Sequence, residues 1–202
     1  MVIIRDYPEH SEINPILYDI ITDKCCMKHK YGAFATEWQA VDGNFFGEKV
    51  EAFDKLSAWI NELLPDVARE LHKPTQSAWP DFSKFNFYEY WGMFYPPDSA
   101  TQVHCHFPFA ISFGYYVNAP IGSSPLMIHD LRDIQEGNIE PLESVPLRNG
   151  RIVFFYGNTV HGVPPSSVDG RCMIAGNVTY TPDSKVEVED FYVDKEENYT
   201  RT

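Results

Sequence analysis

The hydrophobic pattern of this chain changes its period near residue 84, and that change limits the folds open to it. Before this point, apolar residues recur every three or four positions, as on one face of a helix. Residues 85–91 (Phe-Asn-Phe-Tyr-Glu-Tyr-Trp) are instead aromatic and have the period of two that is typical of a strand. Helices first and short strands afterwards predict an α+β domain that is mainly β.

Two helices are expected in the N-terminal part. Apolar residues at helical spacing predict the first over residues 13–27, with Ser11 as its N-cap and Pro15 in its first turn. The second is predicted over residues 48–64, and its aromatic side chains should belong to the core. Pro65 should kink or end this helix, with a further turn or two beyond it.

The rest of the chain is predicted to form strands that build a double-sheet jelly roll or small barrel, with the helices packed on it. We expect a single domain over residues 1–202, made of a helical support region, a β core and an acidic tail. These parts cover residues 1–83, 84–181 and 182–202. The expected strands cover residues 85–91, 102–106, 110–118, 126–129, 151–156 and 172–179.

Composition excludes some classes of protein. The 202 residues are 44% hydrophobic, which is enough for the core of one domain. The 16 basic and 29 acidic residues give a net charge of −13, which disfavours nucleic acid and anionic membranes as partners. The N-terminus lacks the features of a signal peptide and no run of 18 apolar residues occurs, so we expect a cytoplasmic protein. The four cysteines have no zinc-site spacing and are expected to be reduced thiols.

Three histidines are candidate metal ligands. On a strand, alternate side chains share a face, so His104 and His106 would point the same way and could chelate one ion. A third nitrogen from His161, on a distant strand, would leave other coordination positions open for chemistry. Cys105 and Cys172 should point away from the site and pack in the core.

Arg171 is a candidate anion-binding residue. It follows His161 by ten positions, and its guanidinium could clamp a carboxylate with two parallel hydrogen bonds. If Arg171 faces inward, strand alternation turns Met173, Ala175 and Asn177 inward as well. Asn177 is then a pocket residue.

The order of these residues resembles that of a known family. Residues 104–117, HCHFPFAISFGYYV, resemble the motif H-x-H-P-x-x-x-L-S-G-x-Y-Y-V of a 2-oxoglutarate/Fe(II)-dependent oxygenase family of bacteriophages and bacteria, within the prolyl-4-hydroxylase-like superfamily. Phe107 and Phe113 replace the proline and glycine of that motif. The later blocks NGRIVFF (149–155), HGVPP (161–165), Gly170-Arg171 and Asn177 are similar to the family in type and order. The resemblance covers residues 85–180, about half of the chain.

The resemblance implies a double-stranded β-helix (jelly-roll or cupin-like) core that binds Fe(II), 2-oxoglutarate and O2. Such an enzyme hydroxylates a substrate while 2-oxoglutarate is converted to succinate and CO2, chemistry that comes from the metal centre in a water-poor pocket. The implied ligands are His104, His106 and His161; Arg171 and Tyr116 would bind the far carboxylate of 2-oxoglutarate, and Asn177 with Tyr95 or Trp91 would line the pocket.

The third metal ligand is open at this point. A facial triad has two histidines and one carboxylate, and His106 stands where the carboxylate is expected. Either three imidazoles hold the iron, or Asp130, after the strand over 126–129, replaces one of them. Three neutral imidazoles make the Fe(II) site one charge unit more positive, which favours a dianionic co-substrate. We prefer the three histidines.

Two other functions fit the same residues. One is a three-histidine cupin-like metalloprotein that uses no 2-oxoglutarate, and the other is a non-catalytic, metal-bearing interaction module. The substrate is not readable from the sequence: a peptide and a small molecule are both allowed. The oligomeric state is open, with a dimer as one option, and a phage-encoded protein would work in the host cytoplasm.

Overall fold

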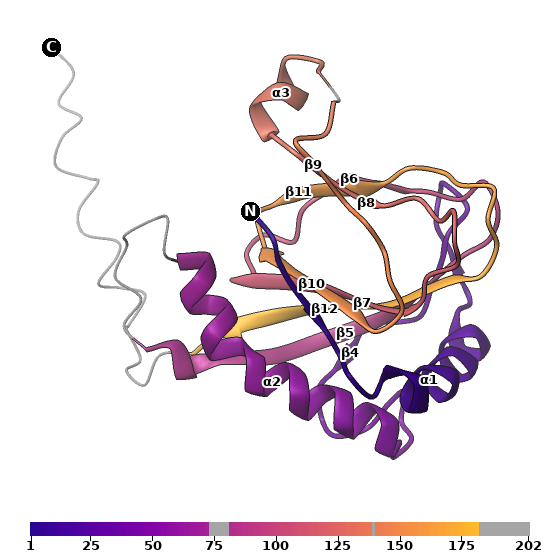
Figure 1. Cartoon of the computed structure of the whole chain (residues 1–202), viewed down its shortest axis with the longest axis vertical. Coiled ribbons are helices and arrows are strands. Elements are labelled where there is room, and N and C mark those ends of the chain that lie inside the picture. The colour runs from indigo at the N-terminus through magenta and orange to yellow at the C-terminus, as the bar shows by residue number, and fades with distance from the viewer. Residues whose placement is uncertain (73–80, 139, 182–202) are drawn as a thin grey trace, which may run out of the picture.

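The computed structural model describes residues 1–72, 81–138 and 140–181, and two antiparallel sheets that face each other form its centre (Figure 1). The larger sheet has the strand order β1-β10-β7-β12-β5-β3-β2, with β4 also paired to β5. Its strands are β1 (Ile3–Asp6), β2 (Met27–Lys28), β3 (Phe34–Ala35), β4 (Gln39–Ala40), β5 (Phe85–Tyr95), β7 (Ile111–Asn118), β10 (Arg151–Tyr156) and β12 (Arg171–Tyr180).

The smaller sheet has the order β6-β11-β8-β9. Its strands are β6 (Thr101–His104), β8 (Leu126–His129), β9 (Glu143–Val145) and β11 (Val160–Val163). The helices are α1 (His10–Lys24), α2 (Glu51–His72), α3 (Leu131–Gln135) and the short 3-10 helix η1 (Phe82–Lys84). The prediction of a mainly β domain with a two-sheet core is confirmed, whereas the predicted tail over 182–202 lies outside the described residues.

Helices α1 and α2 cover the outer face of the larger sheet (Figure 1). A buried asparagine on α1 ties that helix to β7: Tyr115 Oη donates to Asn14 Oδ1 at 2.6 Å, and Asn14 Nδ2 donates to the Val117 carbonyl at 2.6 Å. The helix begins at His10, so the prediction of Ser11 as N-cap, with Pro15 in the first turn, was wrong. The helix includes the three residues before Ile13, the first apolar residue of the predicted face. Pro15 therefore lies in its second turn.

Helix α2 continues beyond Pro65 to His72, which confirms the further turn or two predicted after the proline. A proline inside a helix costs about 3 kcal/mol, because it removes one backbone hydrogen bond and crowds the preceding turn. Burial of Val67 and Leu71, both no more than 1% exposed, stabilises the last turns by about 1.5–3 kcal/mol each. The apolar face beyond the proline therefore outweighs the local penalty.

The core has two layers. One lies between the helices and the larger sheet and includes the α2 aromatic residue Phe53, as predicted. The other lies between the two sheets and contains Trp91, Tyr95, Tyr116 and Met173. Because this second layer is where the two sheets face each other, side chains from both sheets can meet there.

Two further expectations concern membranes and cysteines. None of the described helices combines the length and apolarity needed to span a membrane. All four cysteines are free thiols, as predicted. Cys172 is fully buried and packs in the core, but Cys105 is exposed, so the prediction that it packs inside was wrong. Cys105 lies beyond the end of β6, where strand alternation no longer applies.

Candidate functional site

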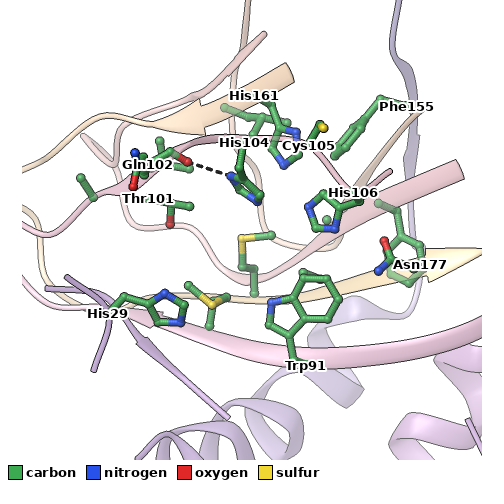
Figure 2. A pocket seen from close by; sticks show the side chains of 18 of the residues that line it. His29, Trp91, Thr101, Gln102, His104, Cys105, His106, Phe155, His161 and Asn177 are labelled. Carbon is green, nitrogen blue, oxygen red and sulfur yellow. Dashed lines mark hydrogen bonds between the residues drawn. The ribbon is translucent and has the colours of Figure 1, made fainter. Parts of the chain in front are cut away.

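His104, His106 and His161 lie together between the two sheets, and each offers a ring nitrogen within 4.8 Å of the others (Figure 2). His104 ends β6 and is the direct antiparallel partner of His161 on β11, which places both side chains on one face. The strand predicted over 102–106 ends at His104, so His106 belongs to the following loop. The ring centroids are 4.4–5.1 Å apart.

The loop position of His106 depends on a close approach between two chain segments. The His106 amide donates to the Gly157 carbonyl at 2.6 Å, and the Gly157 amide donates to the Ala110 carbonyl at 3.2 Å. A Cβ at Gly157 would lie 2.0 Å from the Phe109 carbonyl oxygen, so only glycine fits there. The His106 ring also stacks on Trp91, with centroids 5.4 Å apart at 18°. Backbone and ring contacts together aim this imidazole at the other two.

Two backbone carbonyls set the tautomers of the other imidazoles. His104 Nδ1 lies 2.7 Å from the Gln102 carbonyl oxygen, and His161 Nδ1 lies 2.9 Å from that of Thr159. A carbonyl oxygen only accepts, so each Nδ1 must carry the proton. The lone pair of each Nε2 is then free, which is the usual arrangement of metal-binding histidines with an outer partner.

The environment keeps the imidazoles neutral. Burial lowers the pKa of His161 to about 3, and the nearby His104 adds to this effect. Burial followed by the nearby His104 lowers the pKa of His106 to about 4, against an opposing hydrogen bond with Asn177. Three neutral nitrogen donors at neutral pH suit a divalent transition metal such as Fe(II).

We expect the metal-free protein to lose stability in acid through these histidines. Both folded-state pKa values lie below the ordinary value of 6.5, so the unfolded chain takes up protons first. Stability is therefore complete above pH 6.5 and is lost as the pH falls toward the folded-state values. At pH 5, His161 alone should cost about 2 kcal/mol.

Urea unfolding at pH 7.5 and 5.0 in the presence of a chelator measures this loss. The variant His161→Gln should lose about 2 kcal/mol less than the wild type between the two pH values, since the carboxylates of the fold contribute equally to both proteins. An identical pH dependence in wild type and variant would show that the His161 imidazole is not held neutral by the fold.

Asp130, the alternative third ligand, lies elsewhere. Its carboxylate caps α3 by accepting from the Arg132 amide at 2.7 Å, and this hydrogen bond lowers the pKa of the carboxyl group. Asp130 also lies 3.6 Å from the Arg132 guanidinium and does not belong to the histidine group or to the cavity beside it. Because the helix N-terminus holds this carboxylate, the alternative of Asp130 as a ligand has no support in the fold.

A cavity of about 450 Å³ opens beside the three histidines. Figure 2 shows His106 above the indole of Trp91, with Asn177 next to it. Met173, Ala175 and Asn177 of β12 all line this cavity, as predicted from strand alternation. Asn177 accepts from Ser112 Oγ at 2.7 Å. The predicted pocket residues Tyr95, Trp91 and Tyr116 line it as well.

Arg171 is buried, only 3% exposed, next to this cavity. Its guanidinium carbon lies 4.6 Å from the ring centroid of Tyr95 and 5.5 Å from that of Tyr116, and both tyrosines line the main cavity. Arg171 itself borders a small adjoining pocket with Ser124, whose carbonyl accepts from Nη1 at 2.8 Å. Arg171 therefore lies inside the fold, in contact with two tyrosines that line the main cavity, but it does not itself line that cavity.

Two buried donors at this end have no hydrogen-bond partner among the described residues: Arg171 Nε and Tyr116 Oη. Burial raises the pKa of Tyr116 to about 12, so its hydroxyl is a neutral donor at physiological pH. No acidic side chain of the described chain forms an ion pair with Arg171. A buried charge without a partner costs several kcal/mol, so the site fits an anionic ligand.

Comparison with solved structures identifies the fold of this chain. No family model and no curated protein matches the sequence. Among solved structures, the viral collagen prolyl hydroxylase of Paramecium Bursaria Chlorella virus-1, in its 2OG complex, is 15% identical, with a TM-score of 0.60 over 89% of this chain and 96% of that one. A Pseudomonas putida prolyl-4-hydroxylase is 14% identical, with a TM-score of 0.57 over 90% and 93%. A 2OG-Fe(II) oxygenase family oxidoreductase from Burkholderia pseudomallei is 11% identical, with a TM-score of 0.54 over 88% and 84%.

The chain has the double-stranded β-helix fold of the 2OG-Fe(II) oxygenases. At identities of 15% or less this likeness concerns the fold, and the function has to be argued from the residues.

Within this oxygenase fold, the structure adds site residues that sequence reasoning missed. Glu89 and Trp38 line the cavity. Alternation along β5 would have found Glu89, because it shares a face with Trp91 and Tyr95. The Gln102 and Thr159 carbonyls that orient the histidines carry no sequence signal, since every residue type has a carbonyl.

Proposed function

We propose that the protein is an Fe(II)- and 2-oxoglutarate-dependent dioxygenase that hydroxylates a substrate and releases succinate and CO2. One observation carries the proposal: the cavity beside the three histidines is also lined by Tyr95 and Tyr116, and these tyrosines contact the buried guanidinium of Arg171, which has no acidic partner among the described residues. The fold supports it, because solved structures with the same fold are named as enzymes of this type.

The residues fit both groups. His104, His106 and His161 would hold Fe(II), for which imidazole is a suitable ligand. Arg171 Nε and Tyr116 Oη are the unpaired donors that a carboxylate of 2-oxoglutarate would satisfy. When bound, the iron and 2-oxoglutarate supply the oxidising chemistry with O2. The protein would leave the Nε2 lone pairs of His104 and His161 free for the metal and would orient the anion with Arg171 and Tyr116.

Of the other functions considered, neither explains the anion end of the cavity. A metalloprotein without 2-oxoglutarate, or a non-catalytic module, leaves the buried charge of Arg171 without a role. The substrate, whether a peptide or a small molecule, would enter the remaining part of the cavity.

Anaerobic titration tests the proposal. Addition of Fe(II) and 2-oxoglutarate should give a weak visible charge-transfer band, and admission of O2 should then release succinate. Fe(II) with succinate in place of 2-oxoglutarate is the control and should give no band. A folded protein that retains iron but shows neither band nor succinate would contradict the proposal.

A further inference from the structure

Two opposite charges lie along the paired strands that form the floor of the cavity: Glu89 lines the cavity, and Arg171 lies beside it in the adjoining pocket. Strands β5 and β12 pair in register from Tyr95 opposite Arg171 to Glu89 opposite Asn177. These two pairs are six residues apart along β5, or roughly 20 Å. Between these two pairs, Trp91 lies opposite Ala175, two residues from Glu89 along β5. The Trp91 ring stacks on that of His106. Arg171 thus marks the end that suits an anionic co-substrate, and Glu89 marks the opposite end.

The protein gives the Glu89 carboxylate a hydrogen bond but no positively charged partner among the described residues. The side chain is half-buried and lines the cavity, and Glu89 Oε1 accepts from Asn177 Nδ2 at 2.8 Å. No lysine, arginine or histidine in the described part of the chain forms an ion pair with it. A partly desolvated carboxylate with one neutral hydrogen bond favours a cationic partner.

Aromatic rings line the same cavity as this carboxylate. Trp38 is 69% exposed, and its ring lies 5.6 Å from that of Trp91, so an indole face is available beside Glu89. Phe107, which is 78% exposed, lines the same cavity. Aromatic faces attract cations through the ring quadrupole, and indole does so most strongly. Carboxylate and rings therefore favour the same kind of ligand.

Two basic side chains of the cavity lining outside the three-histidine group are in contact with water. His29 and Lys30 are exposed, and Lys30 Nζ lies 5.2 Å from the ring centroid of Tyr31. Charges in contact with water are screened over about a Debye length, so these side chains weaken the field of Glu89 only modestly.

We propose that Glu89, with the exposed indole of Trp38, binds the ammonium or guanidinium group of the substrate that is hydroxylated. The cationic group lies at the end of the cavity opposite to Arg171, and the metal centre is between the two. This substrate class rests on the proposed oxygenase function, but the binding site itself can be measured without turnover.

Two matched probes test the site. Nα-acetyl-lysine N-methylamide carries the cation, and Nα-acetyl-norleucine N-methylamide is its uncharged counterpart. Binding is followed by tryptophan fluorescence, and substrate use by stimulation of succinate release. The wild type should bind the lysine probe about tenfold more tightly than the norleucine probe, and rising salt should reduce this ratio.

The variant Glu89→Gln should bring the ratio of the two affinities close to one, because the amide oxygen still accepts from Asn177 but carries no charge. Glu37→Gln is the matched control: Glu37 is exposed just before Trp38 and lies outside the cavity lining, so the ratio should persist. The salt dependence in the wild type shows whether the preference is electrostatic, and the contrast between Glu89→Gln and Glu37→Gln assigns it to Glu89.

Failures of the two proposals are distinguishable. Equal affinities for both probes, no binding of the lysine probe, or a ratio retained in Glu89→Gln would overturn the cation site while the Fe(II) and 2-oxoglutarate band could still form. A lysine preference in a protein without band or succinate release would support the cation site and contradict the oxygenase.

Discussion

Replacement of His106 by alanine should lower 2-oxoglutarate turnover by at least roughly a hundredfold, since loss of an outer-shell partner alone costs up to that factor. The physical reason is the loss of one of three nitrogen donors that lie within 4.8 Å of one another, so the remaining two hold Fe(II) weakly. Succinate release and iron content after gel filtration measure the effect.

Two matched variants separate a ligand from a structural residue. His106→Asp supplies the carboxylate of an ordinary facial triad and should recover iron binding, whereas a residue that only packs against Trp91 would gain nothing from it. Asp130→Ala removes the cap of α3 and should leave iron content unchanged. Loss of iron in Asp130→Ala, with retention in His106→Ala, would reverse our assignment of the third ligand.

Replacement of Arg171 by methionine should raise the 2-oxoglutarate concentration needed for half-maximal turnover by more than about a hundredfold. Loss of a buried, charge-assisted contact of this kind costs about 3–5 kcal/mol. The unliganded variant should be as stable as the wild type or more stable, because the guanidinium has an unpaired Nε in the apolar layer. Weaker binding of 2-oxoglutarate together with equal or higher stability of the unliganded variant would identify Arg171 as a residue whose charge serves ligand binding.

Thermal unfolding with and without 2-oxoglutarate checks both parts. At a hundred times its dissociation constant for the wild type, the ligand should stabilise the metal-loaded wild type by about 2.7 kcal/mol and Arg171→Met by no more than about 0.4 kcal/mol. Arg148→Gln is the control, since Arg148 is exposed and lies 3.5 Å from Asp6, away from the cavity. Equal stabilisation of wild type and Arg171→Met would exclude Arg171 as the anion-binding residue.

Much of the fold could be predicted because strand alternation and helical periodicity are local properties. The bounds of β8 and β10 agree with prediction to the residue, and the face of β12 that carries Met173, Ala175 and Asn177 is the predicted one. Strands β1, β2, β3, β4 and β9 were missed, because each is only two to four residues long and carries little periodic signal. For β11, a strand at His161 was expected but without bounds.

Errors arose where tertiary contacts override local preference. The strand expected over 102–106 ends at His104 because the following loop turns to bond Gly157. His106 nevertheless lies beside its partners, held by this loop and by Trp91 instead of by strand alternation. The spacing of His104 and His106 correctly indicated that their side chains lie together, but the prediction that both lie on one strand was wrong.

The sequence by itself determined the class of fold, the three histidines and the arginine, since residue type and periodicity are written along the chain. Only the tertiary structure decided which groups meet: that Asp130 caps a helix, that two carbonyls free the Nε2 atoms of His104 and His161, and that Glu89 lies at the end of the floor opposite to Arg171. These contacts join residues whose pairing depends on strand register and loop path, and neither can be computed from local pattern alone.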